Sequence, residues 1–412
     1  MTTSRRAMLG AGAALAMAAT PDPGIAAPAR ERQGAQAFGT VGDGIADDSA
    51  ALQRALDATF APGSRTPFLV IPPGTYRLTR PLRIDLRENQ TRPGGIIAHG
   101  ARLISKIGDG RPVLSITARA TVRFLLIEGL DIQGSGNDGH GLHIECDDRD
   151  HYIYNFCLRD LTIQECGGDG CRLLGNVFEG QIINSYFRKN RGNGATFAHG
   201  LKGGILSAIH VFGAVFGDNG GHGAALIHHC YDVAFHGCYF LLNAKFGLVA
   251  ENGCTLLSNC GFENNHESAG DFARGDAGID LRGFATLVGC TAYSMFNQTR
   301  LLRAYVVGRL VMIGCSGDGD ARAKGAGLAS LAGRKDASAV IIGCAGAVDY
   351  RDGFDGVEMG GAGGGARFPA DWRSPNLLRI GDHRLWVDGR GRLRAKNGRP
   401  AADDDGGVVG QT

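Results

Sequence analysis

The sequence lacks the features that mark several common protein classes. Lys and Arg (43) nearly balance Asp and Glu (41), which gives a formal net charge of +2, whereas a nucleic-acid-binding protein needs a concentrated basic face. The long apolar run at residues 7–19 is too short and too rich in Ala and Gly to span a membrane. No Cys or His spacing is typical of a zinc site, and no phosphate-binding or dinucleotide fingerprint follows a predicted strand. We therefore expect no nucleic-acid partner and no membrane span.

Glycine is the residue in excess. It accounts for 66 of 412 residues, which is about 16% against a usual ~7%. No period of three is present, so the chain is not collagen-like and the glycines must serve turns. The apolar content of 43% is ample for a large core and too high for a disordered chain.

A repeated frame runs through the middle of the chain. Its clearest copies are residues 184–190, 213–219, 237–243 and 259–265. In the first three copies a Gly follows the last Asn by four residues, whereas Gly278 comes nine residues later than that spacing predicts. Weaker copies begin at residues 129, 160, 289, 314 and 343. Repeats of this length indicate a solenoid, which grows by adding coils.

The first position of every copy is Gly, Asn or Asp. These positions are Gly129, Asp160, Asn184, Gly213, Gly237, Asn259, Gly289, Gly314 and Gly343. Such residues tolerate a left-handed backbone, so we predict one sharp bend per coil. Apolar residues at alternate positions on both sides of the bend predict two short strands, and a third strand follows the later Gly. Three short strands per ~22–31 residues predict a parallel β-solenoid. A two-sheet sandwich would not repeat one turn chemistry in nine consecutive units.

Two further columns repeat with the coils. One holds Cys238, Cys260, Cys290, Cys315 and Cys344, and the other holds Asn190, Asn219, Asn243 and Asn265. We interpret the cysteines as small apolar residues in identical buried slots rather than as disulfides, and the asparagines as a structural amide ladder.

The N-terminus resembles a twin-arginine export signal. Ser4-Arg5-Arg6 precedes an Ala/Gly-rich apolar run, and Ala27-Pro28-Ala29 offers a small-x-small cleavage site. We therefore predict a signal peptide over residues 1–29 and a periplasmic or secreted bacterial protein. Export after folding would bury thiols before they meet an oxidant, so the eleven cysteines do not require a disulfide framework.

The segment that follows predicts a cap for the first coil. Asp47-Asp48-Ser49 precedes a helical run at Ala50–Ala58, and residues 68–78 read as strand, turn and strand. Residues 38–56 together with Ile71-Pro72-Pro73-Gly74-Thr75-Tyr76 resemble the opening of pectate-lyase-superfamily proteins. That resemblance implies an all-β, right-handed parallel β-helix with an N-terminal capping helix. We assign the cap and first coils to residues 30–118 and the remaining coils to residues 119–351.

The C-terminal part differs in composition. Residues 352–366 are Gly-rich and predict a flexible linker. Residues 367–412 contain a hairpin pattern around Asp388-Gly389. This β-hairpin tail is similar to the end modules of some β-helix proteins, including phage-type spikes. It would cap the solenoid or hold a trimer together, and we leave monomer and homotrimer open.

The resemblance implies a carbohydrate substrate, often an acidic polysaccharide, bound in an outer groove of the solenoid. It does not fix the reaction, since one fold hosts several activities. Gly139-His140-Gly141, Gly221-His222-Gly223 and Asp147-Asp148 match elements of polygalacturonase-type hydrolases. The Asn-Thr-Asp and Arg-Ile-Lys elements of that family are absent, and so is the Asp-Pro-His-Asp signature of alginate epimerases.

The outward positions of the third strand predict where chemistry can occur. One column reads His143, Arg172, Thr196, Ala225, Val249 and Asp280, and the parallel column reads Glu145, Leu174, Ala198, Ile227, Glu251 and Arg282. A first charged patch contains His143, Glu145 and Arg172. A second contains Glu251, Asp280 and Arg282, with Arg303 and Lys245 nearby. The insertion within Asn264–Asp276 leads into the second patch, and long loops on one face of a solenoid often mark the binding face.

We assign catalysis to Asp280, Arg282 and Glu251, and substrate binding to His143, Arg172, Lys245, His222 and Arg303. Glu251 and Asp280 are expected ~8 Å apart from strand geometry, within the ~6.5–9.5 Å carboxyl separation of inverting hydrolases. In a lyase, Arg282, Arg303 or Lys245 would take the C5 proton, while Ca²⁺ held by Asp280 and Glu251 is a possible partner of the sugar carboxylate. Alternatively, Glu251 and Arg282 form a solvated cross-strand ion pair.

These assignments lead to one principal hypothesis. We expect an exported polysaccharide lyase that acts on a uronate-containing or other acidic glycan. The alternatives are an inverting glycoside hydrolase on the same scaffold and a non-catalytic, glycan-binding or spike-like structural protein.

Overall fold

The computed structural model describes most of the chain between residues 32 and 409. The described ranges are 32–64, 67–90, 92–146, 148–200, 204–228, 230–251, 255–265, 276–293, 298–318, 327–334, 337–346, 348–350, 355–359, 378–380, 383–388, 390–397, 402 and 404–409. The predicted signal peptide and most of the predicted insertion before Asp280 lie outside these ranges. Within them, no helix combines the length and apolar character that a membrane crossing requires.

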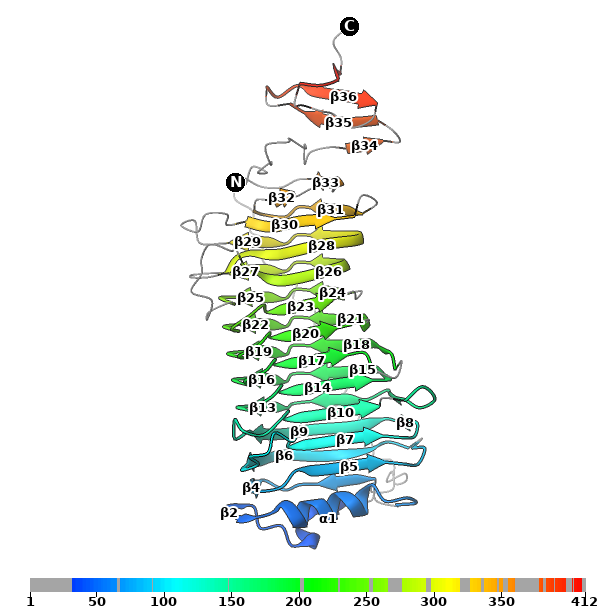
Figure 1. The fold of residues 1–412 in the computed structure, drawn as a ribbon, viewed down its shortest axis with the longest axis vertical. Coiled ribbons are helices and arrows are strands. Elements are labelled where there is room, and N and C mark those ends of the chain that lie inside the picture. The colour runs from blue at the N-terminus through cyan, green and yellow to red at the C-terminus, as the bar shows by residue number, and fades with distance from the viewer. Residues whose placement is uncertain are drawn as a thin grey trace, which may run out of the picture.

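The fold is the parallel β-solenoid that the repeats predict (Figure 1). Three strand ladders, here called sheets I, II and III, run along its length. In each of them the strands of successive coils pair in parallel. Every coil therefore contributes short strands whose apolar side chains meet in one continuous core.

Sheet I contains the third strand of each coil. Its members are β5 (Leu82–Leu86), β7 (Leu114–Ala118), β10 (Leu142–Cys146), β14 (Cys171–Gly175), β17 (Ala195–Ala198), β20 (Ala224–Ile227), β23 (Leu248–Glu251), the first parts of β26 (Asp276–Val288) and β28 (Gln298–Ile313), β30 (Gly327–Gly333) and β32 (Val348–Tyr350). The proposed site residues lie on the outer face of this sheet.

Sheet II precedes the sharp bend of each coil. It comprises β1 (Arg32–Gly34), β3 (Phe68–Val70), the first parts of β6 (Gly94–Ser105) and β9 (Leu125–Gln133), β8 (Val122–Arg123), β11 (Ile153–Tyr154), β12 (Cys157–Arg159), β15 (Val177–Ile183), β18 (Leu206–Phe212), β21 (Cys230–His236), β24 (Thr255–Ser258), the later parts of β26 and β28, β31 (Ser338–Ile342) and β33 (Asp355–Met359).

Sheet III follows the bend. It comprises β2 (Asp43–Asp47), β4 (Gly74–Leu78), the later parts of β6 and β9, β13 (Thr162–Gln164), β16 (Tyr186–Arg188), β19 (Val215–Gly217), β22 (Tyr239–Leu241), β25 (Gly261–Glu263), β27 (Thr291–Tyr293) and β29 (Ser316–Asp318).

The bend between sheets II and III adopts the predicted left-handed conformation in all nine copies. The φ angles are Gly129 72°, Asp160 54°, Asn184 46°, Gly213 59°, Gly237 60°, Asn259 53°, Gly289 62°, Gly314 60° and Gly343 59°. A β-branched or bulky residue would be strained there, which explains why only Gly, Asn and Asp occupy the column.

The predicted asparagine ladder is present in the core. The Asn219 amide donates to Asn243 Oδ1 at 2.9 Å and to the Phe187 carbonyl at 3.0 Å, while its own Oδ1 accepts from the Asn190 amide at 3.1 Å. Asn243 in turn donates to Asn265 Oδ1 at 2.8 Å. All four side chains are buried, so the ladder satisfies polar groups that would otherwise be costly inside the core.

A stack of phenylalanines lies beside that ladder. Phe187, Phe216, Phe240 and Phe262 follow one another with ring centroids 5.3, 4.9 and 4.7 Å apart. The column of Cys238, Cys260, Cys290, Cys315 and Cys344 consists of buried free thiols, as predicted. Burial and hydrogen bonding between neighbouring thiols raise the pKa of Cys290 to about 12, with the Cys260 thiol the largest cause.

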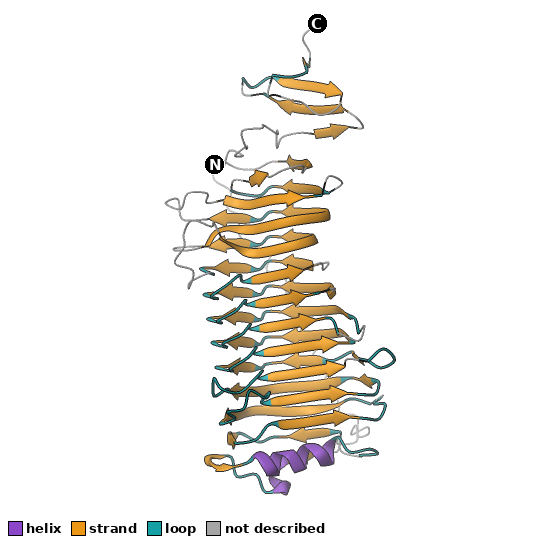
Figure 2. Ribbon diagram, viewed as in Figure 1, coloured by secondary structure: helices purple, strands orange, loops and turns teal. Residues whose placement is uncertain are grey.

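The capping helix is α1 (Ser49–Thr59), which follows the short 3₁₀ helix η1 (Ala35–Phe38) and covers one end of the stack (Figure 2). Its apolar side contains Leu52 and Leu56, both buried in the core. The helix forms where it was predicted, but Asp48 does not cap it with its side chain. The Asp48 carboxylate accepts hydrogen bonds from the backbone N–H groups of Val41 and Gly42 at 2.6 and 3.1 Å, and so secures the preceding loop rather than the helix.

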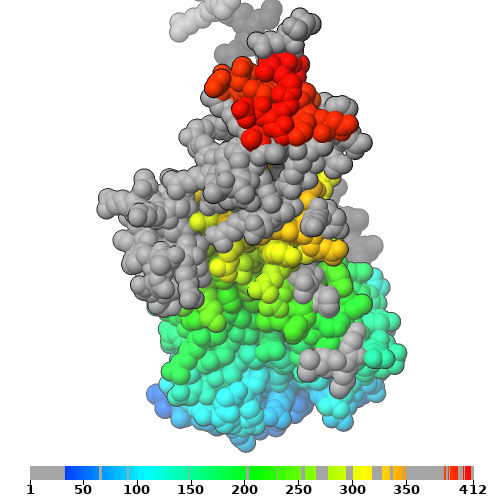
Figure 3. Space-filling view, turned by 45° about the horizontal axis from the view of Figure 1, so that its top comes forward, coloured from blue at the N-terminus to red at the C-terminus, as the bar shows by residue number. Residues whose placement is uncertain are grey.

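The C-terminal region adds two findings. Residues 355–359 of the predicted linker form β33, which pairs with β31 from Ser338↔Asp355 to Ile342↔Met359; sheet II therefore extends beyond the predicted last coil at 351. The predicted hairpin is present as β35 (His383–Val387) and β36 (Leu393–Asn397), within a four-stranded antiparallel sheet with β34 (Leu378–Ile380) and β37 (Gly407–Val408). This sheet projects beyond the end of the solenoid (Figure 3).

The hairpin turn is organised by a buried carboxylate. Asp388 accepts hydrogen bonds from the backbone N–H groups of Arg390 and Arg392 and from the Arg394 guanidinium at 2.6 Å. The Arg394 side chain, followed by these other donors, holds the pKa of Asp388 well below its usual range.

Candidate functional site

The outward column of sheet I has the register that the sequence predicts. His143 lies opposite Arg172, and Arg172 opposite Thr196. Further along, Val249 lies opposite Asp280, and Asp280 opposite Arg303. Neighbouring strands lie ~4.8 Å apart, so residues that are distant in sequence form one continuous surface.

The second patch contains a fixed ion pair. Arg303 donates from Nε to Asp280 Oδ1 at 3.0 Å and from Nη2 to Oδ2 at 3.1 Å. The same guanidinium lies 4.5 Å from the centre of the Phe246 ring. A bidentate pair that also stacks on an aromatic ring holds Arg303 in a single orientation. Both oxygens of Asp280 are therefore engaged within the protein.

The remaining charges of the second patch are arranged differently. Glu251 lies directly opposite Arg282 in the register of β23 and β26, yet no hydrogen bond or ion pair joins their side chains in the described part of the chain. Arg282 and Lys245 are exposed, and Glu251 is half-buried. The alternative Glu251–Arg282 ion pair is therefore not formed, and Asp280 pairs with Arg303 instead; among the residues described, the side chains of Arg282, Lys245 and Glu251 have no ion-pair partner.

The suggested Ca²⁺ role of Asp280 and Glu251 does not fit these residues. The oxygens of Asp280 are bonded to Arg303, and among the residues described no group of three or more His, Cys, Asp or Glu side chains could hold a metal ion. Ca²⁺ prefers six to eight oxygen ligands. The insertion residues 266–275, which the sequence analysis placed beside this patch, lie outside the described residues.

The first patch is more enclosed and larger than expected. His143 Nε2 lies 3.2 Å from Glu145 Oε2, and the His143 ring stacks on His140 at 5.6 Å. Arg172 Nη1 approaches His140 Nε2 at 3.4 Å. The Nδ1 of His143 and the Nε of Arg172 are buried and have no hydrogen-bond partner within the described ranges. The structure therefore brings His143, Glu145 and Arg172 together, as predicted.

His140 also belongs to this patch, although the sequence analysis named it only within Gly139-His140-Gly141 and not among the site residues. Burial lowers its pKa to about 4; Asp169 opposes the shift, and Arg172 and His143 add to it. The imidazole is consequently neutral at pH 7. Its Nδ1 accepts a hydrogen bond from the Asp169 backbone N–H at 3.0 Å.

That hydrogen bond begins a ladder along the edge of sheet I. Asp169 Oδ1 accepts from the Asn193 backbone N–H at 2.8 Å, and Asn193 Oδ1 accepts from the His222 backbone N–H at 2.7 Å. His222 then stacks on Phe246 with the rings 5.8 Å apart and 3° from parallel, and Phe246 contacts Arg303. A wall of fixed side chains therefore connects the first patch to the second.

The sequence carried a signal for this wall that spacing could have revealed. Its members all stand two residues before the first inward residue of a sheet I strand, at His140, Asp169, Asn193, His222 and Phe246. The column varies in residue type, unlike the asparagine ladder, so it does not stand out as a repeat. His222, predicted to bind substrate, lies within this wall.

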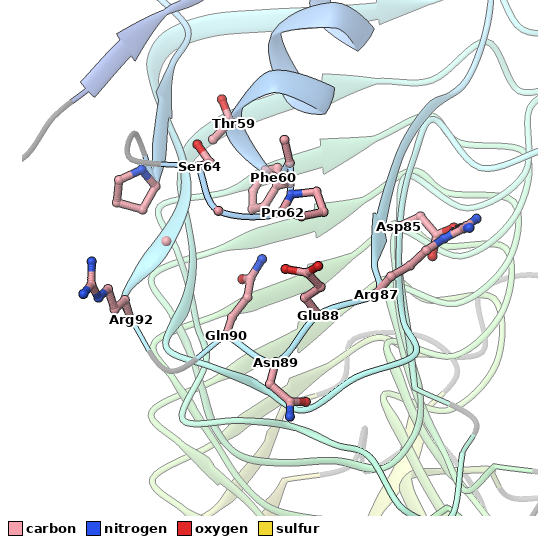
Figure 4. Close-up of a pocket in the computed structure, with 14 residues that line it drawn as sticks. Thr59, Phe60, Pro62, Ser64, Asp85, Arg87, Glu88, Asn89, Gln90 and Arg92 are labelled. Atoms are coloured by element: carbon pink, nitrogen blue, oxygen red, sulfur yellow. Dashed lines mark hydrogen bonds and ion pairs between the residues drawn. The ribbon is translucent and has the colours of Figure 1, made fainter.

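A separate cavity lies at the capping end of the solenoid (Figure 4). It has a volume of about 540 Å³ and is bounded by the loop after α1 and the loop after β5. Among the side chains that line it are Phe60, Pro62, Glu88, Gln90 and Arg92. None of the predicted site residues lines this cavity, so it is distinct from the outer face of sheet I.

Comparison with known protein families and structures supports the fold. Residues 116–292 match the model of the right-handed β-helix region, and residues 343–411 match that of capsule depolymerase. No curated protein matches the chain. The solenoid is therefore a right-handed β-helix.

Several solved structures share the fold at low sequence identity. ORF18 of Geobacillus virus E2 is 17% identical with a TM-score of 0.53, over 93% of this chain and 76% of that one. Tailspike protein 2 of an Escherichia coli O157:H7 bacteriophage is 14% identical with a TM-score of 0.57, over 76% of this chain and 42% of that one. The Agl-KA catalytic domain is 13% identical with a TM-score of 0.53, over 81% of this chain and 69% of that one.

Proposed function

We propose that this protein is an exported polysaccharide lyase that cleaves an acidic, uronate-containing glycan bound on the outer face of sheet I. The observation that carries the proposal is the second patch, where exposed Arg282 lies opposite Glu251 in the register of β23 and β26, while Asp280 is occupied by Arg303. The capsule depolymerase match at residues 343–411 supports a polysaccharide substrate, and so does the fold shared with a bacteriophage tailspike.

The charges of the patch suit an acidic sugar. Arg282 and Lys245 are exposed and have no carboxylate partner among the residues described, so each can bind the carboxylate of a uronate. Their positive charge also stabilises the negative charge that develops when the sugar loses its C5 proton. Arg303 shapes this environment, since its pairing with Asp280 and Phe246 fixes the wall beside the substrate.

In the proposed reaction Glu251 accepts the C5 proton. The electrons of the C5–H bond form the C4=C5 double bond, the C4–O glycosidic bond breaks, and the departing oxygen takes up a proton from water. Arg282, which lies opposite Glu251, holds the uronate carboxylate throughout, and no oxidant or reductant is needed. Carboxylate side chains are among the groups that act as general bases in enzymes.

The inverting-hydrolase alternative fits this patch less well. It requires one protonated carboxyl group as acid and one carboxylate as base. Asp280 accepts two hydrogen bonds from the Arg303 guanidinium, so both of its carboxylate oxygens are already engaged within the protein. Asp280, the carboxylate predicted ~8 Å from Glu251, is therefore not free to act as the second catalytic group.

One experiment with two readouts tests the function. The full chain is incubated with alginate, polygalacturonate, hyaluronate and an acidic bacterial capsule polysaccharide, and both ultraviolet absorbance of unsaturated uronates and reducing ends are followed. A lyase raises both signals, and a hydrolase raises reducing ends alone. Binding without either signal would replace the proposal with the spike-like structural protein.

Export and assembly follow as separate proposals. We infer that residues 1–29 direct export of the folded chain, to be checked by mass spectrometry of the mature N-terminus and by Arg5→Lys with Arg6→Lys. Sedimentation equilibrium distinguishes a monomer from a homotrimer, and deletion of residues 367–412 tests whether the C-terminal sheet holds a trimer together.

A further inference from the structure

An aromatic cluster occupies the corner where sheet I gives way to sheet II, in the coil of β10 and β11. The Tyr152 ring lies 5.5 Å from Phe178 at 47° and 6.1 Å from Tyr154 at 74°. Tyr154 and Phe178 stack on each other at 5.9 Å. Tyr152 is 37% exposed. It therefore rests on the other two rings and remains open to solvent on its outer side.

The backbone that carries Tyr152 is held in place. The Asn176 amide donates to the carbonyls of Asp148 and His151, and its Oδ1 accepts from the Ile205 backbone N–H at 2.6 Å. Asn176 is itself buried. The loop between β10 and β11 is thus anchored to the next two coils, and the ring of Tyr152 is positioned before any ligand arrives, which lowers the cost of binding.

Polar groups surround the cluster. The Arg123 guanidinium lies 5.5 Å from the centre of the Tyr154 ring and 4.2 Å from that of Phe124, and its Nε is buried without a partner among the residues described. His151 Nδ1 lies 3.1 Å from Asp148 Oδ2 at the surface of the same loop. An exposed ring bordered by hydrogen-bonding groups matches the chemistry of a sugar, which has an apolar C–H face and a rim of hydroxyls.

The position of the cluster connects it to the proposed active face. The loop of Tyr152 follows β10 directly, and β10 carries His143 and Glu145 of the first patch. We propose that the Tyr152 platform, defined as Tyr152 with its supports Tyr154 and Phe178, is a glycan-binding subsite that stacks one sugar ring. It would lead a bound chain across the corner from sheet I toward sheet II. That the glycan is acidic rests on the proposed function. That a sugar ring stacks on Tyr152 does not depend on it.

The test is affinity electrophoresis of the full chain in gels that contain alginate, polygalacturonate, hyaluronate or neutral dextran. We expect Tyr152→Ala to weaken retardation about tenfold, while Tyr152→Trp restores it. Tyr186→Ala is the matched control, because Tyr186 is 44% exposed on sheet III. Equal retardation of Tyr152→Ala and the wild type, or no retardation of the wild type in any gel, would overturn the subsite.

A second variant separates this subsite from the proposed reaction. Arg282→Gln is expected to lose lyase activity while its Tyr152-dependent retardation persists. If the wild type shows no lyase activity but its retardation depends on Tyr152, the lyase is refuted and the subsite is kept. Lyase activity with a KM that Tyr152→Ala leaves unchanged refutes the subsite and keeps the lyase.

Discussion

The core and the outer face of the same coils differ in how often one residue type recurs from coil to coil. In the core, one residue type recurs from coil to coil, as in the stack of Phe187, Phe216, Phe240 and Phe262. On the outer face of sheet I, residue type changes at nearly every coil between His143 and Arg303. Each buried slot has the same shape, so packing selects the same side chain. No such demand acts on the outer face, and the charged clusters there need an explanation other than the fold.

The strongest test of this contrast uses two adjacent residues of β22. Phe240 is buried between two rings, whereas Tyr239 is 37% exposed. Phe240→Ala should lower the free energy of unfolding by about 4 kcal/mol through the cavity it leaves. Tyr239→Ala should cost about 1 kcal/mol or less. Denaturant unfolding followed by circular dichroism measures both, and similar losses for the two variants would contradict the contrast.

The asparagine ladder offers the next largest effect. Asn219→Ala deprives the Phe187 carbonyl, the Asn190 amide and Asn243 Oδ1 of a partner, and unsatisfied buried groups cost about 3 kcal/mol together. Asn137→Ala, at an exposed turn, should change stability by about 0.5 kcal/mol or less. If Asn219→Ala has the same free energy of unfolding as the wild type, the chain must satisfy these polar groups in another way.

The outer face should respond in activity instead of stability. Arg282→Gln is expected to reduce kcat/KM on the acidic glycan about a hundredfold, since a charge that acts in the transition state is lost, with the melting temperature unchanged. The control is Arg309→Gln, which removes an exposed arginine from the sheet II part of β28. This variant should have wild-type kinetics. Full activity of Arg282→Gln would move the reaction to the first patch.

The smallest effect concerns pH. The pKa of His140 is about 4 in the folded chain because of burial, in a setting that also contains Asp169, Arg172 and His143, and ~6.5 when unfolded. The unfolded chain therefore binds the proton first, and stability falls as the pH decreases from ~6.5 to about 4. His140→Gln should reduce this dependence. His151→Gln, at a more exposed histidine, should retain it in the same unfolding titration.

Local periodicity explains which parts of the fold were predictable. The bends, the inward columns and α1 depend on residues within one coil, and the structure has each of them. The Asp48 contacts, the wall from His140 to Phe246 and the Asp280–Arg303 pair depend on neighbouring segments whose spacing varies with loop length. β33 was missed because a Gly-rich composition resembles a linker even where the strand has a paired neighbour.

The left-handed residue that begins each frame has a consequence for how such a chain can change in length. Because every coil turns through the same backbone angle, a whole unit such as residues 213–236 could be duplicated or removed without altering its neighbours' geometry. The outer surface would then lengthen or shorten in steps of ~4.8 Å, with the inner columns still aligned. Duplication or loss of whole coils in the gene would therefore change the length of the outer face of sheet I in discrete increments.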